Sequence, residues 1–288
     1  MSPHRLLSLP APAKINLFLH VLGRRPDGYH ELQTIFQFLA YGDQLDFYAH
    51  ENLKLTCQLA EFENEDNLVI RAAQQLKAMT GITAGMHIHL NKRLPSGAGL
   101  GGGSSDAATT LLGLNHLWKL KLSTEELASI GRELGADVPV FIHGQAAWAE
   151  GIGERLSPLH DLACPWYVVL IPPVHVATAT IFQSPQLTRN TPAITLAAFH
   201  AGRVSNDCEP VVCARYPEVK SALDWLNARG QARMTGTGAC VFLACATEDE
   251  AVMCLQQAPY PGLVAKSCNI SPTLEALEAW KDDQDKRS

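Results

Sequence analysis

Five of the 21 glycines fall within the eleven residues 95–105, and their spacing favours the binding of an anion. Glycine permits positive φ angles and lets a ligand approach the main chain closely. An alternating run over residues 86–92 predicts a strand before this segment, and apolar residues at 107, 111, 114 and 118 predict a helix after it. Because the free N–H groups and the positive dipole end of a helix attract anions, we expect a polyphosphate at this junction.

The whole glycine-rich loop is the candidate phosphate-binding segment. Its main-chain N–H groups are the expected ligands of the phosphates, and the hydroxyls at its end add further donors. We also expect Ser104 or Ser105 to cap the following helix. The residues assigned to phosphate binding are Pro95, Ser96, Gly97, Ala98, Gly99, Leu100, Gly101, Gly102, Gly103, Ser104 and Ser105.

Other interpretations of this loop fit its residues less well. Gly97, Gly99 and Gly102 match the dinucleotide-binding fingerprint, but Lys119 and Lys121 stand where that fingerprint needs an acidic residue. The nucleotide P-loop requires a lysine directly after its glycines, and no lysine follows here. A flexible linker rarely runs straight into an amphipathic helix.

A lysine and an amide interrupt the apolar run of residues 11–22, which is typical of a strand. Lys14 and Asn16 point to the same face of this strand, because side chains alternate with a period of two. An edge strand with a solvated face would also explain the pair.

Asp137 is the only Asp, Glu, Lys or Arg between residues 134 and 149. It follows a helix expected over residues 123–134 and precedes an apolar, strand-like run at 138–142. Such an isolated carboxylate suits a group held in one place for proton transfer. The alternative is a local cap or turn residue.

Composition excludes several classes of protein. The 288 residues suggest one large or two moderate domains, and 47% hydrophobic residues support a substantial core. A net charge of -6 argues against a nucleic-acid-binding protein. No apolar run reaches 18 residues, and the first five residues lack the apolar core of a signal peptide. We therefore expect a cytoplasmic protein with no nucleic acid and no membrane as partners.

The eight cysteines are scattered along the chain, and none forms a Cys-x-x-Cys pair. In a long chain this usage favours free, buried thiols in a reducing compartment. His87 and His89 share a strand face with no cysteine or acidic pair beside them. We expect them on the surface, and we expect no metal site built from protein side chains alone.

Alternation, capping signals and turn residues predict the elements that must position these groups. Together they form an α+β pattern. The expected strands are residues 11–22, 32–38, 86–92, 138–142, 166–171, 231–235, 240–244 and 263–269, with a hairpin within 41–59. The expected helices are residues 67–79, 107–118, 123–134, 217–229, 247–258 and 272–280, with turns at 24–28 and 236–239, a loop at 184–194 and a frayed tail at 281–288.

Three separated segments, residues 12–17, 95–106 and 234–239, resemble in order and spacing the three motifs of the GHMP kinases. That family is named for galactokinase, homoserine kinase, mevalonate kinase and phosphomevalonate kinase. The resemblance covers nearly the whole chain. It implies a two-domain α+β GHMP kinase fold with the active site in the cleft between the domains. Residues 1–160 would resemble the second domain of ribosomal protein S5, and residues 161–288 would be ferredoxin-like.

The segments 25–32, 135–141 and 236–242 narrow the resemblance to one branch of the family. That branch uses ATP to phosphorylate the 2-hydroxyl of a cytidine diphosphate-linked methylerythritol, on the non-mevalonate route to isoprenoid precursors. The resemblance implies ATP and a small-molecule acceptor, and it leaves a monomer or a homodimer open. We expect Mg²⁺ to accompany ATP, with Ser105 or Asp106 as candidate protein ligands.

Individual roles follow from the same resemblance. Asp137 would accept the proton of the substrate hydroxyl, and Lys14 would stabilise the alkoxide and the phosphoryl charge. Asn16 would orient the lysine or the substrate.

A further set of residues would bind the cytidine base. Tyr29 and Phe182 would stack on its two faces, and His30 would act mainly through its main chain. An aromatic residue after a turn, such as Tyr29, is otherwise a surface residue or a core anchor.

Two alternative functions remain at this point. One is a GHMP kinase with another small-molecule acceptor, such as homoserine or mevalonate. The segment Asp27–Gly28–Tyr29–His30 argues against it, because other branches lack it. The second is a catalytically silent ATP-binding regulator, which the presence of both Lys14 and Asp137 disfavours.

Overall fold

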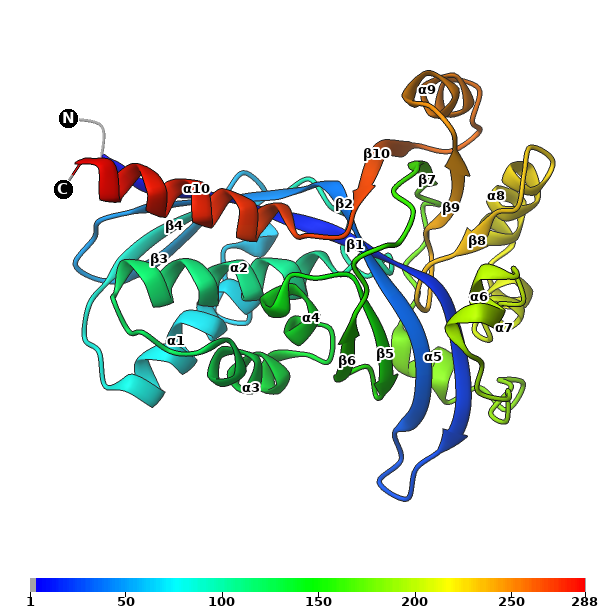
Figure 1. Cartoon of the computed structure of the whole chain (residues 1–288), viewed down its shortest axis with the longest axis horizontal. Coiled ribbons are helices and arrows are strands. Elements are labelled where there is room, and N and C mark those ends of the chain that lie inside the picture. Colours follow the sequence, from blue (N-terminus) through cyan, green and yellow to red (C-terminus); the bar gives the residue numbers. More distant parts are fainter. Residues whose placement is uncertain (1–3, 288) are drawn as a thin grey trace.

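A long antiparallel hairpin runs through the molecule. It consists of β1 (Arg5–Arg24) and β2 (His30–Tyr48), paired along nearly their whole length in the computed structural model, which describes residues 4–287. The turn between them is closed by a hydrogen bond of 2.8 Å from the Arg25 N–H to the Tyr29 carbonyl. Figure 1 shows these two blue strands extending from the chain termini to the projecting turn. The strands expected at 11–22 and 32–38 are the central parts of this hairpin.

The first half of the chain adds strands to β2 and packs helices against them (Figure 1). The strands are β3 (Leu53–Cys57), β4 (Met86–Asn91), β5 (Ala147–Gly151) and β6 (Arg155–Pro158). The helices are α1 (Leu68–Thr80), α2 (Gly102–Leu117), α3 (Thr124–Leu134) and α4 (Val138–His143), with a short 3₁₀ turn, η1 (Ala60–Phe62). A large apolar cluster fills this half and includes Phe47, Ile88 and Leu111, all fully buried.

The second half forms a four-stranded antiparallel arrangement in the order β10-β7-β9-β8. Its strands are β7 (Trp166–Leu170), β8 (Arg233–Met234), β9 (Val241–Cys245) and β10 (Gly262–Cys268). Its helices are α5 (Thr178–Phe182), α6 (Leu196–His200), α7 (Glu209–Arg215), α8 (Pro217–Asn227) and α9 (Glu248–Gln256). β10 also pairs with β2, so one continuous sheet joins the two halves.

The last helix, α10 (Pro272–Arg287), returns to the first half of the molecule. The indole N–H of Trp280 donates to the Leu6 carbonyl (3.0 Å), and Leu277 is buried in the cluster of the first half. Figure 1 shows this red helix lying along β1, far from α9. The division into residues 1–160 and 161–288 stays a prediction, and the C-terminal segment packs across it.

Three expected elements are wrong. Residues 41–48 do not begin a hairpin but continue β2, and β3 pairs in parallel with β4 rather than with β2. Residues 138–142 form helix α4 instead of a strand, since a short apolar run carries no period that separates the two. The charged tail continues α10 as far as residue 287; Ser288, like residues 1–3, lies outside the described residues.

Other expected elements are confirmed. The capping box at Ser123 starts α3, and the Thr247 hydroxyl accepts the Glu250 N–H at the start of α9. The helix expected at 67–79 is α1, although Met79 is 53% exposed instead of packed on the apolar face. β5 and β6 and the short helices α5, α6 and α7 were not expected, because their runs are too short to show a period.

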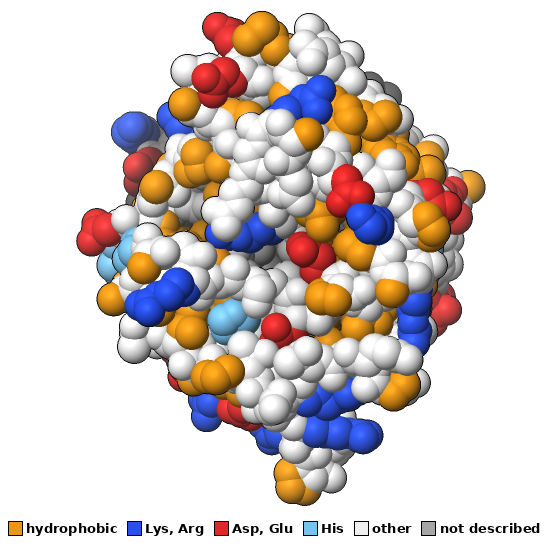
Figure 2. All heavy atoms as spheres, turned by 90° about the vertical axis from the view of Figure 1, so that its right-hand side faces the viewer, with side chains coloured by type: hydrophobic (Ala, Val, Ile, Leu, Met, Phe, Trp, Pro, Cys, Tyr) orange, Lys and Arg blue, Asp and Glu red, His pale blue; other side chains and the backbone are white. Residues whose placement is uncertain are grey.

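All eight cysteines are free thiols; three are buried and Cys164 is exposed, contrary to the expectation that they are buried. Within residues 4–287 no helix is both long and apolar enough to span a membrane. Figure 2 shows one face of the molecule, on which basic, acidic and apolar side chains are interspersed.

Candidate active site

The three distant motif segments meet at one place. The Lys14 N–H donates to the Leu100 carbonyl (2.9 Å), which joins β1 to the glycine-rich loop. From the other side, the Cys240 N–H donates to the Ala98 carbonyl (3.2 Å), and the Thr235 hydroxyl donates to the Gly99 carbonyl (3.3 Å). Both halves of the chain therefore hold the loop in place.

Positive φ angles alternate along the loop. They are +65° at Gly97, +81° at Gly99 and +73° at Gly101, in the left-handed region that L side chains rarely adopt. A Cβ atom at Gly99 would lie 2.4 Å from the Thr235 carbonyl oxygen. The glycines thus provide the expected turn geometry, and Gly99 also permits close packing against the turn that follows Thr235.

The expected serine cap is wrong. Helix α2 begins at Gly102 with Gly101 in the N-cap position, and no side chain caps it. Ser105 already lies inside the helix, fully buried, with its hydroxyl unpartnered. The first N–H groups of α2 therefore have no side-chain acceptor of the cap type and face the position where an anion would bind.

Lys14 and Asp137 form an ion pair beside this helix end. Their Nζ and Oδ2 atoms are 3.1 Å apart, and the Lys14 ammonium also donates to Asn16 Oδ1 (2.8 Å). The Asn16 amide donates in turn to the Thr34 hydroxyl (3.0 Å). The side chain of Lys14 is 4% exposed and that of Asp137 is 35% exposed. The lysine is thus fixed in the interior, while the carboxylate keeps a free surface.

This geometry excludes a solvated edge strand for Lys14 and Asn16 and a capping role for the Asp137 side chain, although Asp137 does lie in a turn. Lys14 and Asn16 are both buried, so β1 presents no solvated edge here. Asp137 stands at the N-cap position of α4, yet its side chain makes no capping hydrogen bond. The carboxylate is therefore available to a ligand.

A central cavity of about 480 Å³ lies over these groups. It brings together Lys14, Asn16, Asp137, Phe182 and the turn at Gly236–Gly238. From the loop it is lined by Pro95, Ser96, Gly97, Ala98, Gly99, Gly101, Gly102, Gly103 and Ser104. Leu100 and Ser105, also assigned to phosphate binding, are buried and do not line it.

Two further cavities adjoin the central one, and each shares lining residues with it. The Asn67 cavity, of about 320 Å³, shares Leu68, Ser96 and Gly103. The Tyr29 cavity, of about 690 Å³, shares Phe182, among others. The three together form one trough, with the phosphate loop and Asp137 in its middle section.

The residues expected around a base all line the Tyr29 cavity. Tyr29 is 60% exposed, and His30 is buried. The rings of His30 and Phe182 are stacked, with centroids 5.0 Å apart and planes inclined by 26°. Burial, followed by the charges of Arg189 and Arg24, lowers the pKa of His30.

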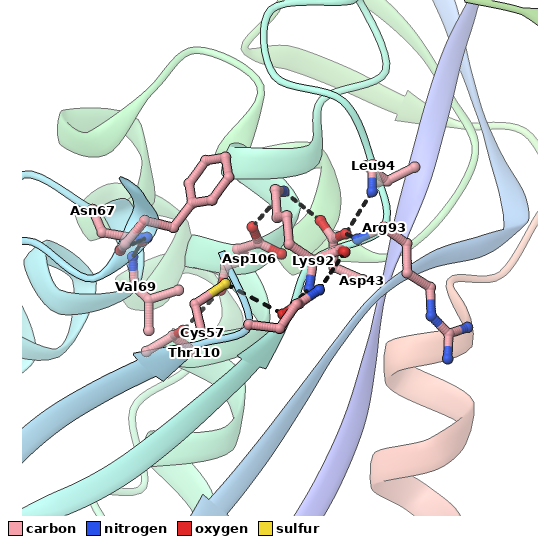
Figure 3. A network of polar contacts seen from close by, with 11 residues as sticks. Asp43, Cys57, Asn67, Val69, Lys92, Arg93, Leu94, Asp106 and Thr110 are labelled. Atoms are coloured by element: carbon pink, nitrogen blue, oxygen red, sulfur yellow. Dashed lines mark hydrogen bonds and ion pairs between the residues drawn. The ribbon is translucent and has the colours of Figure 1, made fainter. Parts of the chain in front are cut away.

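Sequence reasoning missed a buried ionic cluster under the loop, shown in Figure 3. The Lys92 ammonium contacts Asp43 Oδ2 (2.5 Å) and Asp106 Oδ2 (2.9 Å). Asp43 Oδ1 also accepts the N–H groups of Arg93 and Leu94, where the loop begins. Burial raises the pKa of Asp106 to about 8, although Lys92 opposes this. No local sequence motif predicts the cluster, because its members are spread over residues 43–106.

Comparisons with known proteins identify the family to which this chain belongs. The family model "GHMP kinases N terminal domain" matches residues 67–145, and "GHMP kinases C terminal" matches residues 190–259. A solved mevalonate kinase structure has a TM-score of 0.66 at 14% identity over 92% of this chain and 99% of that one, which establishes a shared fold.

Closer relatives carry one name. The 4-diphosphocytidyl-2-C-methyl-D-erythritol kinase of Shewanella denitrificans is 53% identical, covering 96% of this chain and 99% of its own. That of Ectopseudomonas mendocina is 51% identical, covering 96% of each. A crystal structure of a 4-(cytidine 5'-diphospho)-2C-methyl-D-erythritol kinase has a TM-score of 0.80 at 34% identity, covering 91% of this chain and 99% of that one. This chain belongs to the GHMP kinases and, within them, to the family of the 4-diphosphocytidyl-2-C-methyl-D-erythritol kinases.

Proposed function

We propose that this protein transfers the γ-phosphoryl group of ATP to the 2-hydroxyl of 4-diphosphocytidyl-2-C-methyl-D-erythritol, in the methylerythritol phosphate route to isoprenoid precursors. One observation carries the chemistry: a fixed ammonium and an accessible carboxylate, 3.1 Å apart, line the same cavity as the uncapped start of α2. Family membership supplies the acceptor.

Phosphoryl transfer depends mainly on positioning and on stabilising charge. The N–H groups of the loop and of the first turn of α2 bind the phosphates. Asp137 accepts the proton of the attacking hydroxyl. Lys14 stabilises the charge that develops on the hydroxyl oxygen and on the transferred group, and its burial makes that interaction stronger than in water. Asn16 holds the ammonium in place from behind.

The trough places the two substrates at opposite ends of one continuous cavity. The Asn67 cavity adjoins the phosphate loop and suits the nucleoside of ATP. The Tyr29 cavity shares Ala136, the neighbour of Asp137, with the central cavity and shares no lining residue with the Asn67 cavity. It suits the cytidine end of the acceptor, with Tyr29 and Phe182 as stacking partners. The acceptor hydroxyl then meets the γ-phosphate in the central cavity.

Mg²⁺ is proposed to accompany ATP. Residues 4–287 contain no group of three or more His, Cys, Asp or Glu side chains suited to a metal. Mg²⁺ commonly needs only one or two protein oxygens beside phosphates and water. The Ser104 hydroxyl and the Asp137 carboxylate line the central cavity and fit that need, whereas Ser105 and Asp106 do not line it. When bound, the ion neutralises phosphate charge.

The eight free thiols support the proposal that the enzyme works in a reducing compartment, namely the cytoplasm. A monomer or a homodimer stays the prediction for its oligomeric state, and light scattering measures which of the two forms.

A panel of acceptors tests the proposed function. ADP release is measured with ATP and each of four acceptors: 4-diphosphocytidyl-2-C-methyl-D-erythritol, mevalonate, homoserine and galactose. We expect release with the cytidine acceptor alone. Release with mevalonate or homoserine instead would assign another GHMP activity. ATP binding without release for any acceptor would indicate a silent regulator.

A further inference from the structure

Arg189 reaches from the second half of the chain to the wall of the Tyr29 cavity. Its terminal guanidinium nitrogens donate to the main-chain carbonyls of Leu187 (3.1 Å), Phe182 (2.7 Å) and Ser184 (2.8 Å). Its Nε donates to His30 Nε2 at 3.0 Å. One side chain therefore holds the segment that carries Phe182 and also touches the imidazole that stacks on it.

The contact with Arg189 decides where the proton of His30 lies. A guanidinium has five donors and no acceptor, so His30 Nε2 must be the acceptor. The neutral ring then carries its proton on Nδ1, because one nitrogen's hydrogen bond sets the state of the other. A doubly protonated ring would place two N–H groups against each other, and burial and neighbouring arginine charge also disfavour it.

The Nδ1–H of His30 is left open to a ligand. No hydrogen bond joins it to any of residues 4–287, and it is not among their fully buried, unpartnered atoms. His30 lines the Tyr29 cavity. The imidazole therefore presents a hydrogen-bond donor, and not an acceptor, at the end of the trough.

We propose that Arg189 is a positioning residue that sets the base selectivity of the acceptor site by holding His30 as its Nδ1–H tautomer. The inference rests on the proposed function, since the base concerned is that of the cytidine acceptor. Cytosine has an unprotonated N3, which accepts a hydrogen bond, whereas uracil has an N3–H donor. The Nδ1–H pairs with the first and opposes the second, which selects cytidine. The His30 side chain, and not only its main chain, thereby contributes to recognition.

Nitrogen NMR of the histidine rings tests the tautomer without any turnover. In the full-length wild type near neutral pH, we expect His30 Nε2 to resonate as an unprotonated nitrogen and Nδ1 as a protonated one. In Arg189→Met the ring should change toward the Nε2–H form that free histidine prefers, and in Arg189→Lys it should keep the Nδ1–H form. An Nε2–H ring in the wild type would overturn the inference.

Kinetics test the selectivity. We compare kcat/KM for the cytidine acceptor with that for the matching uridine diphosphate-linked acceptor. The wild type should favour cytidine by roughly tenfold to a hundredfold, about the effect of one satisfied against one opposed hydrogen bond. Arg189→Met should bring the ratio to within about threefold. Arg189→Lys should restore much of it, even if its KM for both acceptors rises because Phe182 is held less firmly.

A double variant shows whether Arg189 acts through His30. In a His30→Ala background, adding Arg189→Met should leave the ratio of the two acceptors unchanged. A further change there, or an unchanged ratio in Arg189→Met alone, would overturn the inference while leaving the proposed function intact. No ADP release from the wild type with the cytidine acceptor would instead overturn the proposed function, and the selectivity with it.

Discussion

A buried lysine paired with a partly exposed aspartate suits the two separate roles that we propose for them. Lys14 is held by Asp137 and Asn16, and its ammonium lies 5.2 Å from the centre of the Phe36 ring. These contacts hold its ammonium at one position. Asp137 keeps the accessible oxygen surface that proton transfer requires.

Lys14→Met should lower kcat by roughly 10²–10³, because an ammonium aimed at developing charge is lost. Methionine fills much of the same buried volume, so the protein should still fold. The measurement is kcat with both substrates saturating, together with the midpoint of thermal unfolding. If the folded variant retained normal turnover and only its unfolding midpoint fell, the role of Lys14 would be structural and not catalytic.

Asp106→Asn should stabilise the protein at pH 7–8, by roughly 1 kcal/mol or more, since one pKa unit corresponds to about 1.4 kcal/mol. The pKa of the folded-state carboxyl is raised to about 8, well above its unfolded value. Its contribution to stability is therefore complete below the unfolded pKa, and is lost as the pH rises from about 4 through 8.

Denaturant unfolding of wild type and Asp106→Asn from pH 5 to pH 9 checks this. The asparagine still offers Lys92 an oxygen, and Asp43 remains to balance its charge. The free-energy difference between the two proteins should grow in favour of the variant from pH 5 to about pH 8 and level off above it. A difference that is flat with pH would mean that Asp106 is ionised throughout.

At the scale of elements, the glycine-rich loop is rigid because each half of the chain bonds to it. Gly101→Ala should raise the ATP Kd by roughly tenfold or more. A left-handed alanine costs about 1–2 kcal/mol, and its Cβ would lie 2.9 Å from the Phe141 ring and 3.1 Å from Lys14 Cε. Gly81→Ala is the matched control, with φ of +72° at the end of α1 and open space around it.

Calorimetry with ATP separates the two variants. Both should unfold at lower temperature, since both carry the same backbone strain. Only Gly101→Ala should lose ATP affinity. Equal ATP affinity in the two variants would remove the phosphate-binding role from the loop.

Long, regular elements could be predicted from the sequence, and short apolar ones could not. Alternation located β4, the helical period of apolar residues located α1, and a capping box located α3, because all three signals are local. The apolar run after Asp137 covers only residues 138–142, which is too short to distinguish a strand from helix α4. The predicted start of α2 was wrong, because Gly101, with a positive φ angle, occupies the N-cap position that was expected for a serine.

The candidate site shows the same division. Lys14, Asn16 and Asp137 stood out as polar residues in apolar runs, and the structure brings them together. Arg189 and Asp43 carried no signal, because their partners lie far away in the sequence: His30 is 159 residues from Arg189. Such contacts are fixed by tertiary packing alone.

At the scale of the whole molecule, the hairpin of β1 and β2 serves both halves. β1 carries Lys14, β2 begins with His30, and β2 pairs with β10 of the second half. Another apolar cluster, which includes Phe18 and Phe242, packs the halves together. These connections fix the relative positions of the three cavities that form the trough.

Tyr29→Ala should raise the acceptor KM by roughly tenfold or more and leave the ATP KM unchanged. Stacking of a base on an aromatic ring is worth about 1–3 kcal/mol, and Tyr29 lines only the end of the trough that lies away from the Asn67 cavity. Steady-state kinetics with each substrate varied in turn decides it. An effect on the ATP KM would place Tyr29 at the nucleotide instead of the acceptor.

The most direct test of the proposed chemistry is a single turnover of Asp137→Asn. Enzyme in excess is loaded with γ-labelled ATP and mixed with the cytidine acceptor, and the labelled phosphoester is followed with time. The rate should fall by roughly 10² or more relative to wild type, the scale of a general base, while the ATP Kd measured by calorimetry stays within about twofold. Transfer at the wild-type rate by the folded variant would show that Asp137 is not the base.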